Sequence, residues 1–393
     1  MCLTECLAAS CCLCQSCTGS CRMAARYMYG LLFLLSNILA WIVRDYSLKK
    51  YHLFHYLKGC RSSLDCVGSD GVLRLSFGCF MFFSFMFLTT VGTSSTKDPR
   101  DSWHSGWWPI KTLGWAALMV MPFLIPPHYI AIYGEIARFG AGIFLVIQLV
   151  SFINFIYFWN EEWLNEKYEH IWRVPMILVS AVCFMASLFT IGVMIAWFVT
   201  SKDCKLNVFF ISSTLCLVLF TTLLSVNSKV NAGLLTSGLM AVYIVFLCWS
   251  AIMSEPLSST CRIHPHPSGG KYDWLTIVEF VVGFGAISLA TFTTGVHFRS
   301  FSLPLKAAGA DEGQVQYCYG VFHFVFAIGA MYFAMLLVGW SSHHTIHKWS
   351  IDMGWTGVWV KIANEWLAAG VYGELLICCL TWLWGGLWDC GFS

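Results

Sequence analysis

The chain has 393 residues, of which 58% are hydrophobic and only 11% are charged. An average soluble domain carries roughly 25% charged residues, and a water-soluble fold of this length could not hide so much apolar surface in one core. The formal net charge of +2 gives no strong field that would attract nucleic acid. The composition therefore excludes a soluble globular domain and a nucleic-acid-binding protein, and it predicts an all-α integral membrane protein.

Each membrane-spanning helix needs roughly 20 mostly apolar residues. Windowed hydropathy predicts about ten such helices in a domain that covers residues 27–393. In chain order they are residues 27–43, 73–92, 112–127, 135–159, 174–199, 207–226, 231–253, 273–297, 317–340 and 361–385. Pro122, Pro126 and Pro127 interrupt the third of these, because proline cannot donate a helical hydrogen bond.

The segment before the first span, residues 1–26, is rich in cysteine. The spacing of Cys11, Cys14 and Cys17 resembles a zinc pattern, but the segment lacks histidine and leads directly into a membrane helix. Cysteines beside a bilayer are good targets for S-acylation, and a zinc site is the alternative. The predicted acylation sites are Cys11, Cys12, Cys14, Cys17 and Cys21. We predict no metal ion and no cofactor for this protein.

The orientation of the chain is predicted from its cysteines. Lys and Arg divide almost evenly between the two sets of connecting segments, so the positive-inside rule does not decide. If both termini lie in the cytosol, four cysteines face the oxidising side, where disulfides persist. These are the disulfide candidates Cys60 with Cys66, and Cys204 with Cys261. We therefore expect a cytosolic N-terminus.

Several polar side chains fall within the predicted spans. A charge in the hydrocarbon region is costly, so such groups usually face a helix interface or a wet cavity. The candidates for a polar path are Gln148, Asn154, Glu279, Lys361 and Glu374. For Gln148 and Asn154, ordinary hydrogen bonds between helices are an equal alternative, whereas Glu279 favours a functional role.

No catalytic motif appears in the chain. It contains no Gly-x-Ser-x-Gly elbow and no His-Glu-x-x-His pair. The run from Gly106 to Thr112 lacks the second glycine of a phosphate-binding loop. His343, His344 and His347 have helical spacing, but no cysteine or carboxylate accompanies them, so an ordinary interfacial position is favoured over a metal site. We expect no enzymatic activity.

Four motifs, in one order along the chain, resemble the serine incorporator (Serinc/TMS) family. They are Lys97 to Asp101 followed by Trp108 and Lys111, the run from Ile147 to Trp163, Phe322 to Trp340, and Trp355 to Trp366. The third of these is most similar to the plant branch. The family-motif residues are Asp98, Pro99, Arg100, Trp159, Asn160, His323, Trp355 and Trp359.

The resemblance implies ten helices in two bundles, joined by one long tilted helix over roughly residues 129–163. It also implies a role in the incorporation of serine into phosphatidylserine and sphingolipids, and in passive movement of lipids between leaflets. The implied partners are membrane phospholipids, serine and lipid-synthesis enzymes, with homo-oligomers as a further expectation. The implied location is the endomembrane system (ER or Golgi) or the plasma membrane. One departure concerns Asn154, because the family usually carries Asp there.

These observations favour a lipid scramblase, in which a polar furrow lets a head group cross while its acyl tails stay in hydrocarbon. The alternatives are a serine carrier and a scaffold that recruits lipid-synthesis enzymes.

Overall fold

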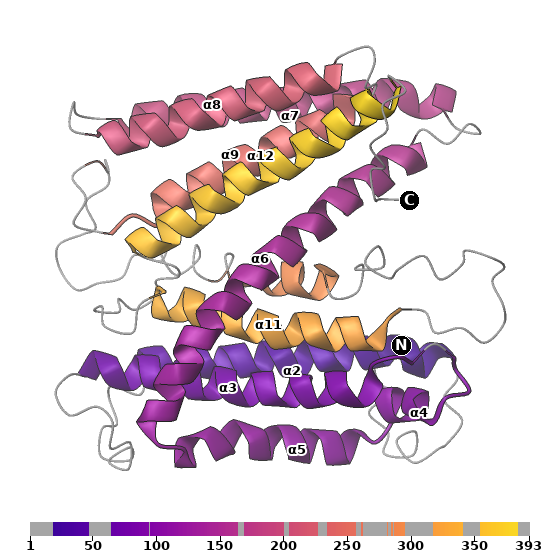
Figure 1. The fold of residues 1–393 in the computed structure, drawn as a ribbon, viewed down its shortest axis with the longest axis vertical. Coiled ribbons are helices and arrows are strands. Elements are labelled where there is room, and N and C mark those ends of the chain that lie inside the picture. The colour runs from indigo at the N-terminus through magenta and orange to yellow at the C-terminus, as the bar shows by residue number, and fades with distance from the viewer. Residues whose placement is uncertain are drawn as a thin grey trace. The chain divides into compact units, whose positions relative to one another are not determined.

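The computed structural model describes most of the hydrophobic segments of the chain. The described residues are 19–46, 64–93, 95–163, 169–199, 204–226, 234–256, 261, 281, 284–285, 287–294, 317–340 and 354–383. Within them the protein is all-helical (Figure 1). The helices are α2 (Gly19–Tyr46), α3 (Leu64–Thr90), α4 (Pro99–Ser105), α5 (Trp108–Val120), the 3₁₀ helix η3 (Met121–Leu124), α6 (Pro127–Trp163), α7 (Glu169–Phe198), α8 (Lys205–Val226), α9 (Leu234–Met253), α11 (Tyr319–Val338) and α12 (Trp355–Leu383).

Seven of these helices are long and apolar enough to cross a membrane. The candidate spans are Ala24–Tyr46, Gly68–Thr90, Pro127–Tyr157, Val174–Phe198, Lys205–Ser225, Leu235–Met253 and Tyr319–Val338. A multi-pass membrane protein built of helices is thereby confirmed. Most of the predicted span at residues 273–297 lies outside the described residues. The predicted last span belongs to α12, which begins earlier, at Trp355.

The predicted span at residues 112–127 differs from the structure. Helix α5 has only 13 residues and gives way at Met121 to the 3₁₀ turn η3. Pro126 has no N–H to donate to the carbonyl oxygen of Pro122, four residues earlier. The Pro122 oxygen accepts instead from the N–H of Ile125 (3.2 Å) and from Nη1 of Arg74 (2.6 Å). Nη1 of Arg74 also donates to the carbonyl oxygen of Ile125 at 2.7 Å. A short helix and a tight turn therefore replace a full span.

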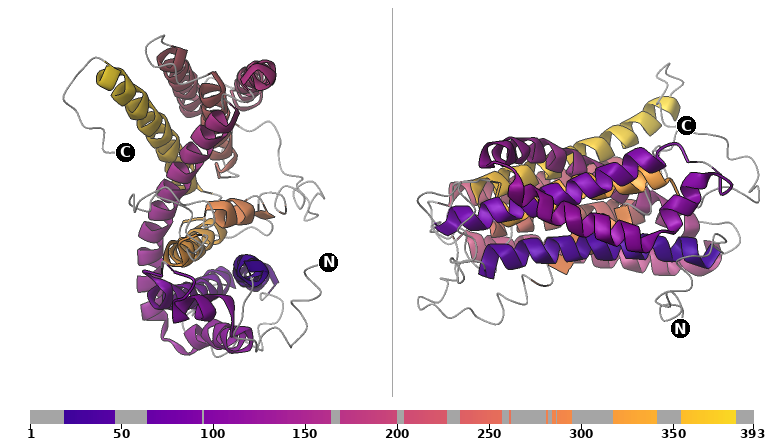
Figure 2. Two further views of the ribbon diagram at one scale, coloured as in Figure 1. Left: turned by 90° about the vertical axis from the view of Figure 1, so that its right-hand side faces the viewer. Right: turned by 90° about the horizontal axis from the view of Figure 1, so that it is seen from below.

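The chain divides into two compact units, and helix α6 contributes residues to both. Unit 1 comprises Met1–Gln148 and Trp274–Asp352, and unit 2 comprises Leu149–Asp273 and Met353–Ser393. Figure 2 gives two further views of the helices within each unit.

Helix α11 forms the centre of unit 1. It packs against α3 and α2, and 17 of its 20 residues are buried. Its Phe326 ring contacts the rings of Phe33 and Phe83, with centroids 4.9 and 5.2 Å apart. The hydroxyl of Ser76 in α3 donates to the carbonyl oxygen of Ala330 at 2.9 Å. Apolar packing and one polar contact together fix the register of α3 against α11.

Unit 2 is a bundle of α7, α8, α9 and α12 with the last part of α6. Its core contains buried side chains from each of these helices, among them Ile153, Met194, Phe210, Ile244 and Ile362. The ring of Phe152 in α6 stacks on Tyr243 in α9, with centroids 4.3 Å apart. Helix α12 packs against both α8 and α9, so the side chains between these three helices are enclosed.

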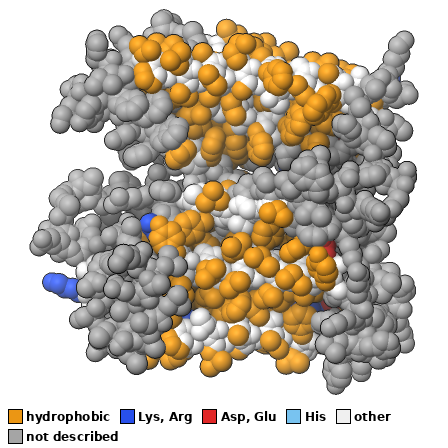
Figure 3. All heavy atoms as spheres, turned by 180° about the vertical axis from the view of Figure 1, so that it is seen from behind, with side chains coloured by type: hydrophobic (Ala, Val, Ile, Leu, Met, Phe, Trp, Pro, Cys, Tyr) orange, Lys and Arg blue, Asp and Glu red, His pale blue; other side chains and the backbone are white. Residues whose placement is uncertain are grey.

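The outer surface of the described helices is apolar. Figure 3 shows hydrophobic side chains over most of the described surface on one face of the molecule. Large side chains stand fully outward, such as Leu124 (81% exposed), Phe139 (77%) and Phe189 (74%). Soluble monomers rarely expose contiguous apolar patches of this kind. The surface is therefore one that lipid chains cover.

Candidate functional site

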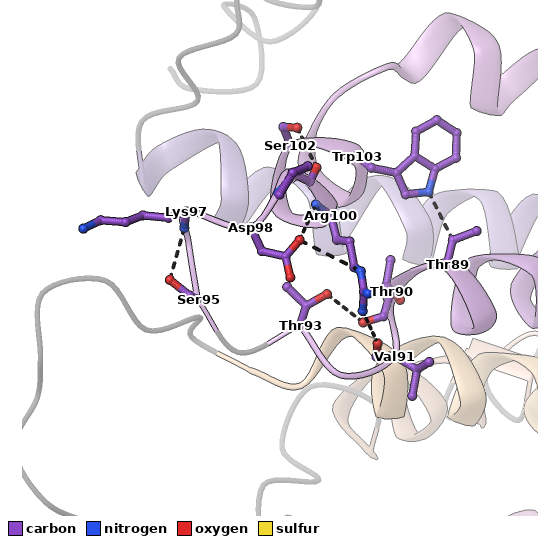
Figure 4. A network of polar contacts seen from close by, with 11 residues as sticks. Thr89, Thr90, Val91, Thr93, Ser95, Lys97, Asp98, Arg100, Ser102 and Trp103 are labelled. Carbon is purple, nitrogen blue, oxygen red and sulfur yellow. Dashed lines mark hydrogen bonds and ion pairs between the residues drawn. The ribbon is translucent and has the colours of Figure 1, made fainter.

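The turn between α3 and α4 holds the first family motif (Figure 4). The carboxylate of Asp98 caps α4 by accepting from the backbone N–H of Arg100 at 3.0 Å, and Pro99 occupies the first turn. Acidic caps and an early proline both favour a helix start. The Arg100 guanidinium donates to the carbonyl oxygen of Val91 at 2.8 Å. The motif therefore ties α4 back onto the end of α3.

Helix α4 directs His104 into unit 1, where its ring is fully buried. Nδ1 of His104 lies 3.1 Å from Nε2 of His323 in α11, and Nε2 lies 2.9 Å from the hydroxyl of Tyr317. The ring also stacks on Tyr319 at 3.8 Å, and the Tyr319 hydroxyl donates to Asp101 at 2.6 Å. These contacts join the motif turn to the start of α11.

Lys111 lies beneath the same cluster with only 2% of its surface exposed. Its Nζ donates to the carbonyl oxygen of His104 at 2.9 Å, and the hydroxyl of Tyr29 donates to that oxygen at 3.0 Å. The ammonium also sits over the rings of Trp108 (4.8 Å), Trp103 (5.1 Å) and Tyr29 (5.3 Å). Cation–π contacts and a charge-assisted hydrogen bond stabilise this buried charge.

The electrostatics of the cluster keep its rings neutral. Burial, the neighbouring His323 and the Lys111 ammonium hold the pKa of His104 well below its usual value. Burial raises the pKa of Tyr317, although Arg26 opposes that change. Nδ1 of His323 is buried and has no hydrogen-bond partner among the described residues. The cluster therefore fixes the motif turn against the start of α11.

Two amide side chains predicted to line a polar path lie on α6. Gln148, the last residue of the first segment of unit 1, and Asn154, in unit 2, are both partly exposed. Asn160, in the same helix, is buried, and its Oδ1 atom has no hydrogen-bond partner within the described ranges. Trp159 lies beside it in the backbone of α6, and its side chain is outside the described part.

Lys361 lies at the start of α12, in unit 2. Its Nζ donates to the hydroxyl of Ser254 at 2.6 Å and to the carbonyl oxygen of Ser250 at 3.2 Å. These contacts attach Lys361 to the end of α9. Trp355 and Trp359 are both exposed, and Trp359 also contacts the ring of Phe210 with centroids 5.3 Å apart.

The structure joins Cys204 to Cys261 by a disulfide within unit 2. For some of the other predicted site residues the side chain is not described. Cys66, Cys21 and Glu374 lie in helices whose side chains at those positions are not described. The candidates outside the described residues are Cys11, Cys12, Cys14, Cys17, Cys60 and Glu279.

Sequence reasoning missed the cluster around His104. His104 directly follows Trp103, and Lys111 comes three residues after Trp108, so both fall in the segment of the first motif. Their place among the motif residues was the signal that could have found them. It also missed Glu365, a fully buried carboxyl one turn after Lys361 in α12. No group of three or more His, Cys, Asp or Glu side chains in the described ranges is arranged to hold a metal ion.

Comparison with known proteins gives the family. The sequence matches the family described as Serine incorporator (Serinc) over residues 1–312 and 304–382. The chain belongs to the serine incorporator family. A probable serine incorporator of Monosiga brevicollis is 29% identical, over 92% of this chain and 90% of its own length. Serine incorporator 3 of Bos taurus is 26% identical, over 95% of this chain and 94% of its own length. A probable serine incorporator of Dictyostelium discoideum is 29% identical, over 81% and 82%.

This serine incorporator is a non-enzymatic multi-pass membrane protein. The family membership that the four short motifs predicted is therefore confirmed.

Proposed function

We propose that this serine incorporator lets phospholipids move passively between leaflets, and that this movement supports the incorporation of serine into phosphatidylserine and sphingolipids. The names of its relatives, Serine incorporator 3 and probable serine incorporator, support the serine-linked role. Lipid movement accounts for that role without any catalytic group.

The observation that carries the proposal is the position of Gln148 and Asn154 on α6. Both amides are partly exposed, whereas nearby Ile143, Val146 and Phe155 are apolar and at least 45% exposed. A head group that enters hydrocarbon loses its hydrogen bonds with water. Amides beside a lipid-facing surface offer replacement hydrogen bonds and so lower the barrier to crossing.

Alanine variants test this assignment. We expect Gln148→Ala with Asn154→Ala to slow leaflet exchange by about fivefold per amide, since a contact worth about 1 kcal/mol corresponds to that factor in rate. The matched control is Asn37→Ala, which removes a buried amide that donates to the carbonyl oxygen of Phe33 in its own helix. Equal rates for the double variant and the control would refute the assignment.

The second candidate is a serine carrier, or a scaffold that recruits lipid-synthesis enzymes, and the names of the relatives favour it equally. Saturable serine uptake by the purified protein, without lipid exchange, would support the carrier. Copurification with a lipid synthase, without either transport activity, would support the scaffold.

The finer architecture is part of the same proposal. It comprises ten spans in two bundles, with α6 as the long joining helix. The proposal also assigns the protein to the plant branch of the family and expects it to form homo-oligomers. Its expected location is the ER or Golgi, the plasma membrane, or both. The partners are phosphatidylserine, sphingolipids, serine and lipid-synthesis enzymes.

A further inference from the structure

Glu365 places a carboxyl group inside the helix bundle of unit 2. The residue is 0% exposed and lies in α12, which packs against α8 and α9. Figure 1 shows α12 in yellow beside α9. The Oε1 atom is 2.7 Å from the hydroxyl oxygen of Thr214, and the Oε2 atom has no hydrogen-bond partner in the described part of the chain. Within the described residues Glu365 forms no ion pair, so its charge would be uncompensated there.

The contacts of Thr214 bear on the protonation state of Glu365. The Thr214 hydroxyl also lies 2.8 Å from the carbonyl oxygen of Phe210, one turn earlier in α8. A carbonyl oxygen and an ionised carboxylate only accept hydrogen bonds, and a hydroxyl has one proton to donate. One proton can make one short, linear hydrogen bond, but not two at once. Both short contacts become hydrogen bonds if Glu365 is protonated, donates to Thr214, and Thr214 donates to Phe210.

The neighbouring groups fit this arrangement. Cys248 of α9 is fully buried and interacts with Glu365 electrostatically, and Tyr243 is the other titratable side chain on that part of α9. On α12, the Lys361 ammonium donates to Ser254 and Ser250 of α9. Tyr372, two turns further on, contacts Ser225 and Thr236. An ionised carboxylate in such surroundings would pay a large desolvation cost.

We propose that Glu365 is a proton-binding site within the membrane domain and is neutral at pH 7. The protonated carboxyl donates a hydrogen bond to the hydroxyl of Thr214. The site does not depend on the proposed lipid movement. A neutral, buried carboxyl also reacts with a hydrophobic carbodiimide. Its proton moves to one carbodiimide nitrogen while its oxygen bonds to the central carbon, and an acyl shift from oxygen to nitrogen then gives a stable N-acylurea.

The first experiment treats the full-length protein in phosphatidylcholine vesicles with dicyclohexylcarbodiimide at pH 7, followed by peptide mass mapping. We expect one carbodiimide mass on the Glu365 peptide and none on the peptide of Glu135, a 63% exposed carboxylate paired with Arg138. The Glu365→Gln variant should lose the adduct. It should also keep its thermal midpoint, since a glutamine amide can still donate to Thr214.

Infrared difference spectroscopy gives the deciding readout, because it does not require the reagent to reach the site. We expect the wild type minus Glu365→Gln spectrum at pH 7 to contain the carbonyl band of a protonated carboxylic acid. If that variant fails to fold, Thr214→Val serves instead, and loss of the hydrogen-bond acceptor should shift the same band to higher frequency. Carboxylate bands in the difference spectrum, or no band shift in Thr214→Val, would overturn the proposal.

Discussion

Nδ1 of His104 lies 3.1 Å from Nε2 of His323, although the two residues are 219 positions apart in the chain. His104 belongs to the short helix α4 and His323 to the buried helix α11. Both rings are fully buried, and their shared hydrogen bond needs one nitrogen to donate and the other to accept. The family motif that forms α4 therefore determines where the first turns of α11 can sit.

Acidification should destabilise the protein through His104. Its pKa is well below 6.5 in the folded state, because of burial first and of His323 and Lys111 next. In the unfolded chain His104 binds a proton near pH 6.5, whereas in the folded protein it stays neutral at that pH. The neutral His104 ring therefore makes its full contribution to stability above about pH 6.5. Below it, the free energy of unfolding should fall by up to about 1.4 kcal/mol per pH unit.

Thermal unfolding in detergent between about pH 7.5 and pH 5.5 measures this slope. The His104→Gln variant is the control, because glutamine does not titrate in that range and its slope should be smaller. A slope identical to that of the wild type would assign the pH dependence to other groups.

Arg74 should be essential for stability. Its guanidinium is 2% exposed, pairs with Asp70 at 2.6 Å, and donates to the carbonyl oxygens of Pro122 and Ile125. Removing one partner of a buried ion pair costs about 3–5 kcal/mol, so Arg74→Ala should lower the free energy of unfolding by that amount. Arg138→Ala removes an equally short but exposed pair with Glu135 and should cost about 0–1 kcal/mol. Equal losses would contradict the role assigned to Arg74.

Two glycine variants should change stability in opposite directions. A Cβ atom at Gly78 of α3 would meet the carbonyl oxygen of Leu118 in α5, whereas no described residue lies within 4 Å of a Cβ at Gly114. Alanine is about 0.8–1.0 kcal/mol better than glycine inside a helix. Gly114→Ala should therefore raise the unfolding temperature, and Gly78→Ala should lower it because α5 must move away. Thermal unfolding of the two variants measures both changes. A lower unfolding temperature for Gly114→Ala, or an unchanged one for Gly78→Ala, would contradict this packing.

The bond between Cys204 and Cys261 closes a separation of 57 residues. Loop-closure entropy predicts that Cys204→Ala lowers the free energy of unfolding by about 4 kcal/mol. Cys216→Ala, which removes an exposed free thiol of α8, should have no such effect. Peptide mapping without reductant checks the linkage itself, and finding both thiols free would also remove the support for a cytosolic N-terminus.

The sequence predicted the apolar helices well, because a membrane-spanning segment needs a long apolar run that hydropathy detects directly. Residues 174–199 and 317–340, for example, correspond closely to α7 and α11. The third span was mispredicted because hydropathy does not detect that the chain turns into a 3₁₀ helix at Met121, nor that Arg74 of another helix binds the carbonyl oxygens of that turn.

The candidate site was harder to predict. The contacts of His104 with His323 and of Thr214 with Glu365 join residues 219 and 151 positions apart. Hydropathy and local motifs carry no information on such distant pairs, and the side chains look unremarkable in isolation. By contrast, Asp98 and Pro99 act within one turn of helix, so their capping role follows from adjacent residues.

Leaflet exchange in reconstituted vesicles tests the proposed function most directly. Purified protein would be placed in vesicles that contain fluorescent phosphatidylserine or phosphatidylcholine, without ATP, and its folding would be checked by thermal unfolding. We expect exchange of both lipids above that of protein-free vesicles, and a reduced rate for the Gln148 and Asn154 double variant. No exchange by the folded wild-type protein would contradict passive lipid movement and leave serine supply or scaffolding as its role.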